Sequence, residues 1–308
     1  MTFAIVFPGQ GSQSLGMMNA YGDTAVIRST FDEASAALGR DLWTLVAEGP
    51  AEALNQTVNT QPLMLTAGVA VYRLWREKGG AIPAMVAGHS LGEYSALVVA
   101  GVLDLKDAVP LVELRAKAMQ EAVPAGMGAM AAILGLDADA IKMVCAEVAQ
   151  GEVVQAVNFN APEQTVIAGH AAAVQRAADG CKTKGAKRAV MLPVSAPFHC
   201  TLMQPAAERL KARLADLALR TPQIPVVNNV DVAVVSDPAE IRDALVRQAA
   251  APVRWVEIMR VMESRGVAQV LECGPGKVLS GVAKRCAAGV NGLAMADLAG
   301  LEAALAAV

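Results

Sequence analysis

Apolar and polar positions alternate along the chain with two different periods, and this pattern predicts a series of strands and helices. Short apolar runs predict buried strands at Phe3–Phe7, Met85–Gly88, Pro225–Asn229 and Ala268–Glu272. Apolar residues at helical spacing predict helices that include Gln61–Lys78, Leu91–Ala100, Asp107–Ala122, Pro238–Ala249 and Val256–Arg265. Pro62 suits the first turn of the helix expected at Gln61–Lys78. Strands that alternate with helices imply a mainly parallel sheet that is covered on both faces.

The pattern changes between Gly126 and Val194. Here it predicts the order β-α-β-β-α-β, over Gly128–Leu134, Ala138–Ala149, Val153–Phe159, Thr165–Gly169, Ala171–Lys184 and Lys187–Leu192. That order is the ferredoxin-like motif. We therefore expect an α/β protein with a large α/β-hydrolase-like domain, formed by residues 1–125 and 197–308. A ferredoxin-like subdomain of residues 126–196 is expected as an insertion within it.

Composition narrows the class of protein. Of the 308 residues, 54% are apolar and the mean hydropathy is +0.39, yet much of this is alanine. The longest apolar stretches, such as Ala96–Leu103, are far shorter than the roughly 18 residues of a membrane-spanning helix. The first residues lack a basic region and lead directly into Pro8-Gly9, which favours a strand over a signal peptide. We expect a protein with no membrane partner.

Charge and cysteine content restrict the partners further. The net charge of −3 disfavours a nucleic-acid binder. The five cysteines are odd in number and form no CxxC pair, which favours a reducing compartment. We expect a cytoplasmic protein that holds no metal and no bound cofactor.

The motif Gly88-His89-Ser90-Leu91-Gly92 lies where a predicted strand passes directly into a predicted helix. It matches G-x-S-x-G, the nucleophile elbow, in which a tight turn holds the serine in a strained backbone. Ser90 would stand at the helix N-terminus, where free N–H groups favour developing negative charge. The Leu91 N–H would point toward an oxyanion. A helix-capping serine is the alternative, and the strand–turn–helix context favours the nucleophile.

A serine nucleophile needs a general base, and the chain contains three histidines. His89 adjoins Ser90, but neighbouring side chains at a tight turn diverge, so we expect it to pack structurally. His170 follows a strand of the predicted subdomain, where a role in a turn or cap is expected. His199 lies just past the predicted insertion, where the chain re-enters the large domain. Elimination therefore favours His199 as the base.

Arg115 is a charged residue on an apolar helix face. On the helix predicted for 107–122, the stripe at i, i+3, i+4 spacing contains Ala108, Leu111, Val112, Ala118, Met119 and Ala122. Arg115 lies on this stripe, whereas Glu113, Lys117 and Glu121 form the opposite, solvated side. An inward arginine needs an anionic partner. That partner is either an internal carboxylate or, in the functional interpretation, the carboxylate of a substrate.

Several further motifs, taken in chain order, resemble one family. They are Phe7-Pro8-Gly9-Gln10-Gly11-Ser12-Gln13, Asn59-Thr60-Gln61-Pro62, Gly88-His89-Ser90-Leu91-Gly92-Glu93, Arg115, Pro197-Phe198-His199, and Gln248 with Pro252-Val253-Arg254-Trp255. Together they closely resemble the malonyl-CoA:acyl carrier protein transacylases of dissociated fatty-acid synthesis. The resemblance covers nearly the whole chain, including the insertion. GHSLGE alone is moderately specific, whereas the ordered set is highly specific.

The resemblance implies a ping-pong acyl transfer. Ser90, activated by His199, would attack the thioester of malonyl-CoA and release CoA. The malonyl group would then pass from the serine to the phosphopantetheine thiol of acyl carrier protein. Both substrates would bring their own phosphopantetheine.

The resemblance also implies roles for further residues. The backbone N–H groups of Gln10 and Leu91 would form the oxyanion hole. Arg115 would bind the free malonyl carboxylate, and Gln61 would line the site. The backbone carbonyl of Gln248 would orient the base in place of a triad carboxylate, because a carbonyl can also fix the imidazole tautomer.

Three alternatives remain at this point. A serine esterase or thioesterase would need an acid, for which Asp104, Asp137, Asp139 and Asp179 are candidates, and it would not explain Arg115. A nucleotide-binding module could use Gly9-Gln10-Gly11, but Ser14 replaces the third glycine of GxGxxG. A malonyl transferase of malonate decarboxylase or a stand-alone polyketide acyltransferase would share the chemistry and serve another carrier.

An acidic carrier protein should be steered by basic residues. Two groups are candidates: Lys182, Lys184, Lys187 and Arg188 near the end of the insertion, and Lys277, Lys284 and Arg285 beside another helix. A solvated charged surface is the alternative interpretation for each.

Overall fold

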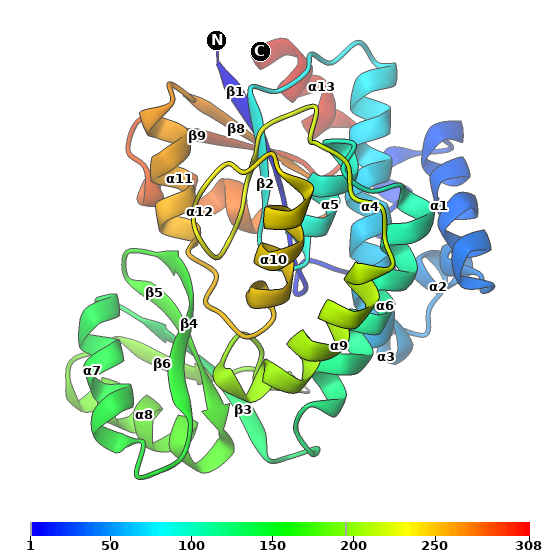
Figure 1. Cartoon of the computed structure of the whole chain (residues 1–308). Coiled ribbons are helices and arrows are strands. Elements are labelled where there is room, and N and C mark those ends of the chain that lie inside the picture. The colour runs from blue at the N-terminus through cyan, green and yellow to red at the C-terminus, as the bar shows by residue number, and fades with distance from the viewer. Residues whose placement is uncertain (1, 195) are drawn as a thin grey trace.

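The computed structural model describes residues 2–194 and 196–308 and consists of a large lobe and a small lobe (Figure 1). Met1, in the predicted first part of the large domain, and Ser195, in the predicted insertion, lie outside the described residues. The small lobe contains β3 to β6 with α7 and α8, and it lies beside the carboxyl-terminal edge of the large lobe's sheet (Figure 1). The predicted fold class is confirmed.

The large lobe is built on a parallel sheet with the strand order β7-β2-β1-β8-β9. Its strands are β1 (Phe3–Phe7), β2 (Met85–Gly88), β7 (Val226–Val227), β8 (Gln269–Cys273) and β9 (Asn291–Met295). In the register of β1 with β2, Phe7 pairs with Gly88, so the loops that follow both strands leave the sheet side by side. Ligand sites in open parallel sheets form at this carboxyl edge.

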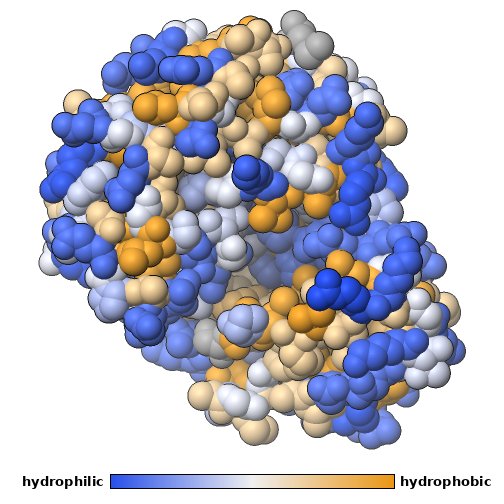
Figure 2. All heavy atoms as spheres, turned by 180° about the vertical axis from the view of Figure 1, so that it is seen from behind, coloured by the Kyte–Doolittle hydropathy of each residue, from blue (hydrophilic) through white to orange (hydrophobic). Residues whose placement is uncertain are grey.

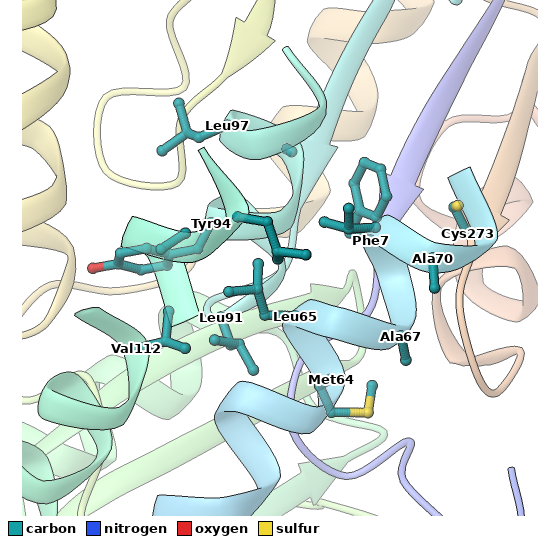
Figure 3. Packing of buried hydrophobic residues seen from close by; sticks show 14 of the residues in the cluster. Phe7, Met64, Leu65, Ala67, Ala70, Leu91, Tyr94, Leu97, Val112 and Cys273 are labelled. Atoms are coloured by element: carbon teal, nitrogen blue, oxygen red, sulfur yellow. The ribbon is translucent and has the colours of Figure 1, made fainter. Parts of the chain in front are cut away.

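Helices cover both faces of the sheet. Successive residues of β1 point to opposite faces, and all five are buried, so both faces carry apolar side chains that need a covering layer. Phe3, Ile5 and Phe7 contribute to a core with α1, α4, α5 and α6, part of which Figure 3 shows around Phe7. Ala4 and Val6 face a second core with α11 and α12. The helices of this lobe are α1 (Ala25–Leu38), α2 (Leu42–Ala47), α3 (Ala51–Leu54), α4 (Thr57–Glu77), α5 (Gly92–Val99), α6 (Leu105–Glu121), α9 (Gln204–Ala215), α10 (Pro238–Gln248), α11 (Trp255–Ser264), α12 (Val278–Cys286) and α13 (Leu298–Ala307), with short 3₁₀ turns at Asn19–Tyr21 and Thr201–Met203.

The small lobe has the predicted order β-α-β-β-α-β. It consists of β3 (Gly128–Leu134), α7 (Ala138–Val148), β4 (Val154–Ala161), β5 (Gln164–His170), α8 (Ala171–Thr183) and β6 (Arg188–Met191). Its antiparallel sheet has the order β4-β5-β3-β6, and α7 and α8 share a core with one face of it.

Backbone hydrogen bonds join the two lobes at β4. Val253, just before α11, donates to the Val157 carbonyl and accepts from the N–H of Phe159. This pairing continues the edge of the small sheet into the large lobe and fixes how the two lobes meet.

Three details differ from the sequence prediction. Helix α4 begins at Thr57, so Pro62 lies inside it and not in its first turn; the Val58 carbonyl that loses its helical donor lies 3.5 Å from Arg40 Nη2. The strand predicted at Pro225–Asn229 is only two residues long, because the asparagines that follow it bond elsewhere. Strand β9 is not predicted from the sequence, because its apolar run is short and follows Asn291 and Gly292; a side chain at position 292 would meet the Ser280 carbonyl.

Candidate active site

Ser90 lies in the turn between β2 and α5. Its φ of 53° is a left-handed conformation that non-glycine residues rarely adopt, and it turns the side chain away from the sheet. A Cβ at Gly88 would lie 1.8 Å from the carbonyl carbon of Gly92, and a Cβ at Gly92 would lie 2.1 Å from the Phe7 oxygen. Both flanking glycines are therefore required by contact, as the motif predicts.

Asn229, in the turn that follows the neighbouring strand β7, holds this strained turn. Its Oδ1 accepts the Ser90 N–H at 2.8 Å, and its Nδ2 donates to the Gly88 carbonyl at 2.7 Å. Asn229 is fully buried. The residue was not singled out from sequence, although its position at the carboxyl end of a predicted strand is a signal that could have found it.

Ser90 and His199 are in contact. Ser90 Oγ donates to His199 Nε2 at 2.6 Å, and His199 Nδ1 donates to the backbone carbonyl of Gln248 at 3.0 Å. Burial, followed by the charge of Arg115, lowers the pKa of His199 to about 3. The imidazole is therefore neutral at ordinary pH and can accept a proton from the serine.

The other two histidines and the candidate acids have other partners. His89 donates to Asn160 Oδ1 at 2.8 Å and packs on Trp255, while His170 accepts the Val153 N–H at 2.9 Å. The four candidate aspartates are bonded elsewhere: Asp104 pairs with Arg220, Asp137 caps α7, and Asp139 and Asp179 pair with nearby lysines. The hydrogen bond at His199 Nδ1 goes to a carbonyl and not to a carboxylate.

Arg115 is buried on α6, with 1% of its surface exposed, and points at the nucleophile. Its Nη2 donates to Ser90 Oγ at 3.1 Å and to Gln248 Oε1 at 3.0 Å, and its Nη1 donates to Gln61 Oε1 at 2.9 Å. Its face lies over the Tyr94 ring. Within residues 2–194 and 196–308, no carboxylate lies within ion-pair distance of it. All its hydrogen-bond partners are neutral.

Glu93 is a second buried ionisable residue beside the site. Its Oε2 accepts from Gln248 Nε2 and from the Asn229 N–H, both at 2.9 Å. Burial raises the pKa of Glu93 to about 7, and these two hydrogen bonds oppose the rise. Sequence analysis did not assign it a role. The signal was available, because Glu93 interrupts an apolar helix just as Arg115 does.

These groups open into a cleft of about 660 Å³ between the lobes, and Figure 2 shows the surface hollowed where the lobes meet. Its lining includes Gln10, Gln61, Ser90, Leu91, Arg115 and His199 from the large lobe, with Met130, Val166 and Leu192 from the small lobe. Among the described residues, neither the Gln10 N–H nor the Leu91 N–H donates to a protein group. Both are free to bind an oxyanion.

In the part of the chain that is described, no group of three or more His, Cys, Asp or Glu side chains could hold a metal ion. Across the same residues, no helix is both long enough and apolar enough to cross a bilayer.

The two candidate basic groups differ in their pairing. Lys182, Lys184 and Lys187 each lie within ion-pair distance of a carboxylate, those of Asp179, Glu147 and Glu163 respectively. Arg188, the fourth member of that group, is exposed, and no ion pair is found for it among the described residues. Lys277, Lys284 and Arg285 are exposed, and no ion pair is found for them among the described residues. Arg285 lies 3.5 Å from the Gln164 side chain.

Known proteins match this chain over nearly its full length. The model of the acyl transferase domain family matches residues 4–303. The malonyl CoA-acyl carrier protein transacylase of Escherichia coli K12 is 56% identical over 304 residues, which is 98% of each chain. A solved acyl-carrier-protein S-malonyltransferase of Burkholderia pseudomallei 1710b is 59% identical, with a TM-score of 0.98 and coverage of 99% of this chain and 100% of that one.

A further solved structure contains a carrier. It is a malonyl-transacylase in complex with its type II PKS acyl-carrier protein, 54% identical, with a TM-score of 0.98 and full coverage of both chains. Identity and coverage at this level extend through both lobes and the cleft between them. The chain therefore belongs to the malonyl CoA-acyl carrier protein transacylase family of acyl transferases.

Proposed function

We propose that this protein transfers a malonyl group from malonyl-CoA to the phosphopantetheine thiol of acyl carrier protein, through a malonyl ester on Ser90, and so supplies extender units for fatty-acid synthesis. The observation that carries the proposal is the buried Arg115 guanidinium, which faces the nucleophile and whose hydrogen-bond partners among the described residues are all neutral. A buried cation of this kind favours a ligand with a carboxylate. Malonyl-CoA carries that carboxylate and a thioester.

In the first half-reaction, His199 Nε2 takes the proton from Ser90 as Oγ attacks the malonyl thioester carbon. The oxygen that becomes negative accepts from the N–H groups of Gln10 and Leu91. The C–S bond then breaks, and the CoA sulfur receives the proton from His199. Arg115 exchanges its hydrogen bond to Ser90 for the malonyl carboxylate.

The second half-reaction reverses these steps with another thiol. His199 takes the proton from the carrier's phosphopantetheine thiol, and the thiolate attacks the malonyl ester. When the C–O bond breaks, Ser90 recovers its proton from His199. All steps use this chain's own groups and the thiols that the substrates bring.

The proposal extends to the organisation and location of the protein. We divide the chain into a large domain of residues 1–125 and 197–308 and a small domain of residues 126–196. The cytoplasm is the proposed compartment, since all five cysteines are free.

Labelled malonyl-CoA provides the test. We expect a stable malonyl adduct on Ser90 by peptide mass spectrometry, and its disappearance when acyl carrier protein bearing phosphopantetheine is added. Rapid release of malonate without a carrier would identify a hydrolase. Failure to form an adduct would contradict the proposal.

A polyketide carrier is a second candidate, because the structure in complex with a type II PKS acyl-carrier protein is 54% identical to this chain. Comparing kcat/KM for carriers of the two types distinguishes the candidates. Fatty-acid synthesis is supported by a higher value for the fatty-acid carrier.

A further inference from the structure

We propose that Glu93 is a positioning residue for malonyl selectivity: it fixes the orientation of the Gln248 side-chain amide, which in turn holds Arg115 toward the substrate carboxylate. This inference rests on the proposed function and adds a residue to it. The geometry is a continuous chain of hydrogen bonds from Glu93 Oε2 through Gln248 to Arg115 Nη2.

The Gln248 amide is fully used in one orientation. The two hydrogens on Nε2 go to the Ser90 carbonyl at 3.0 Å and to Glu93 Oε2 at 2.9 Å, which leaves Oε1 to accept from Arg115. A flipped amide would turn its NH₂ toward the guanidinium, which has only donors, and its oxygen toward two acceptors. All three contacts would become unfavourable.

Glu93 is the side-chain partner that enforces this choice. It is 2% exposed, and its Oε2 also accepts the backbone N–H of Asn229, which fixes the carboxylate in place. The other acceptor for the amide is the carbonyl of Ser90, a residue of the strained elbow. The acceptor atom of Glu93 therefore orients the Gln248 amide together with the Ser90 carbonyl, and it is the one of the two that a side-chain substitution can move.

The orientation of the Gln248 amide affects Arg115 more than it affects the base, His199. His199 bonds the backbone carbonyl of Gln248, which does not depend on the amide orientation. Arg115 bonds the side-chain oxygen, which does. A disordered amide would leave the guanidinium with a competing donor and a less defined direction. Substrates that need the guanidinium should suffer more than substrates that do not.

Two conservative variants of Glu93 separate the effect of its side-chain length from the effect of its charge. Glu93→Gln keeps an acceptor oxygen at the same reach and removes the charge. Glu93→Asp keeps the charge and withdraws the oxygens by one methylene. We measure kcat/KM for acylation by malonyl-CoA and by acetyl-CoA, and take their ratio. The ratio should fall about tenfold in Glu93→Asp, while Glu93→Gln rescues it to within about twofold of the unchanged protein.

A double-mutant cycle tests the route through the amide. Gln248→Ala removes the amide and keeps the backbone carbonyl. It should lower the ratio by itself, and Glu93→Asp should then lower it no further. The matched control is Glu272→Gln, a buried glutamate whose Oε2 accepts from the N–H and hydroxyl of Ser280. This control should lower the melting temperature and leave the ratio unchanged.

The remaining outcomes overturn the inference. Equal losses for malonyl and acetyl acylation in Glu93→Asp would show that Glu93 only supports the fold. A larger loss in Glu93→Gln than in Glu93→Asp would show that charge acts and reach does not. Additive losses in the double variant would show that Gln248 is not the route. If the unchanged protein forms no malonyl ester, the proposed function fails instead, so the two failures are distinct.

Discussion

The large lobe gives the cleft polar atoms in fixed positions, whereas the small lobe gives it mostly apolar surface. Ser90, Arg115 and His199 all lie in the large lobe and are joined by hydrogen bonds. The small lobe contributes Met130 and Val166, which share an apolar cluster with Phe198 and Cys200 on either side of the base. The large lobe thus arranges charge, and the small lobe places apolar side chains beside it. The same division predicts which variants affect chemistry and which affect access.

The largest effect is expected in the large lobe from Ser90→Ala. Alanine retains a short side chain at the elbow and has no oxygen, so acyl transfer should fall by on the order of 10⁴-fold or more. Intact-protein mass spectrometry after incubation with malonyl-CoA measures this, with circular dichroism as the test of folding. An adduct on the variant would place the nucleophile elsewhere, with Cys200 as the first residue to examine.

Arg115→Ala should change which substrate is used. Removing one partner of a buried charge pair costs about 2–5 kcal/mol. The kcat/KM for malonyl-CoA should therefore fall by the factor that corresponds to this free energy. Acetyl transfer should be retained or improved, because the lost side chain leaves room for a neutral acyl group. The kcat/KM of Arg115→Lys for malonyl-CoA should lie between the values of the unchanged protein and Arg115→Ala, since lysine supplies charge without the planar guanidinium.

The comparison for Arg115 is kcat/KM for malonyl-CoA and acetyl-CoA in all three proteins. If both substrates lose the same factor in a folded Arg115→Ala protein, the arginine is structural. The group that selects the carboxylate would then lie elsewhere in the cleft.

The pH dependence of the reaction rate of Ser90 tests whether His199 is shielded from water. Because burial lowers the pKa of His199 to about 3, the imidazole stays unprotonated below the usual histidine range. Reaction of Ser90 with an uncharged sulfonyl fluoride should therefore persist from about pH 8 to about pH 5. A rate that halves near the ordinary histidine pKa both in the unchanged protein and in Glu93→Gln, which removes the buried carboxyl with a pKa of about 7, would show that water reaches His199.

The smallest effect is expected at the surface. Among the described residues, no carboxylate pairs with Lys277 or Lys284, whereas Lys182 and Lys184 are already opposed by carboxylates. Reversing the first two to glutamate should raise KM for an acidic carrier by about two- to fivefold, and reversing the second two should do less. Self-acylation by malonyl-CoA should be unchanged in both. Equal loss in both half-reactions would argue against docking at either group.

Much of the site follows from local sequence, and the parts that do not follow depend on distant segments. Ser90 lies in a motif that is complete within five residues, and Arg115 is detected because it breaks an apolar helix stripe. The contacts of Asn229 and Gln248 with the elbow are made across 139 and 158 residues of chain, and no local pattern encodes them. The strand predicted through Asn229 is short for the same reason, since Asn229 gives its N–H to Glu93 instead of to the sheet.

The fold shows a similar limit. Strands rich in apolar residues, such as β1, are predicted to the residue, because burial on both faces leaves an uninterrupted run. Strand β9 contains Gly292, which lies too close to Ser280 of α12 for any side chain. Because glycine is unfavourable in strands, it weakens the pattern that would predict the strand. Pro62 marks a helix start in most contexts, yet here the helix continues through it.

The separation along the chain of the groups that meet at Ser90 has a consequence for how the protein folds. His199 is 109 residues from the serine, and the amide and asparagine that hold the turn are farther still. Contacts of such high sequence separation form late, because long loops must close before they are made. On refolding from denaturant, the helical signal should return before Ser90 becomes reactive. Ser90 therefore becomes reactive only when the last long-range contacts have formed. A partly folded chain contains the serine but cannot use it as a nucleophile.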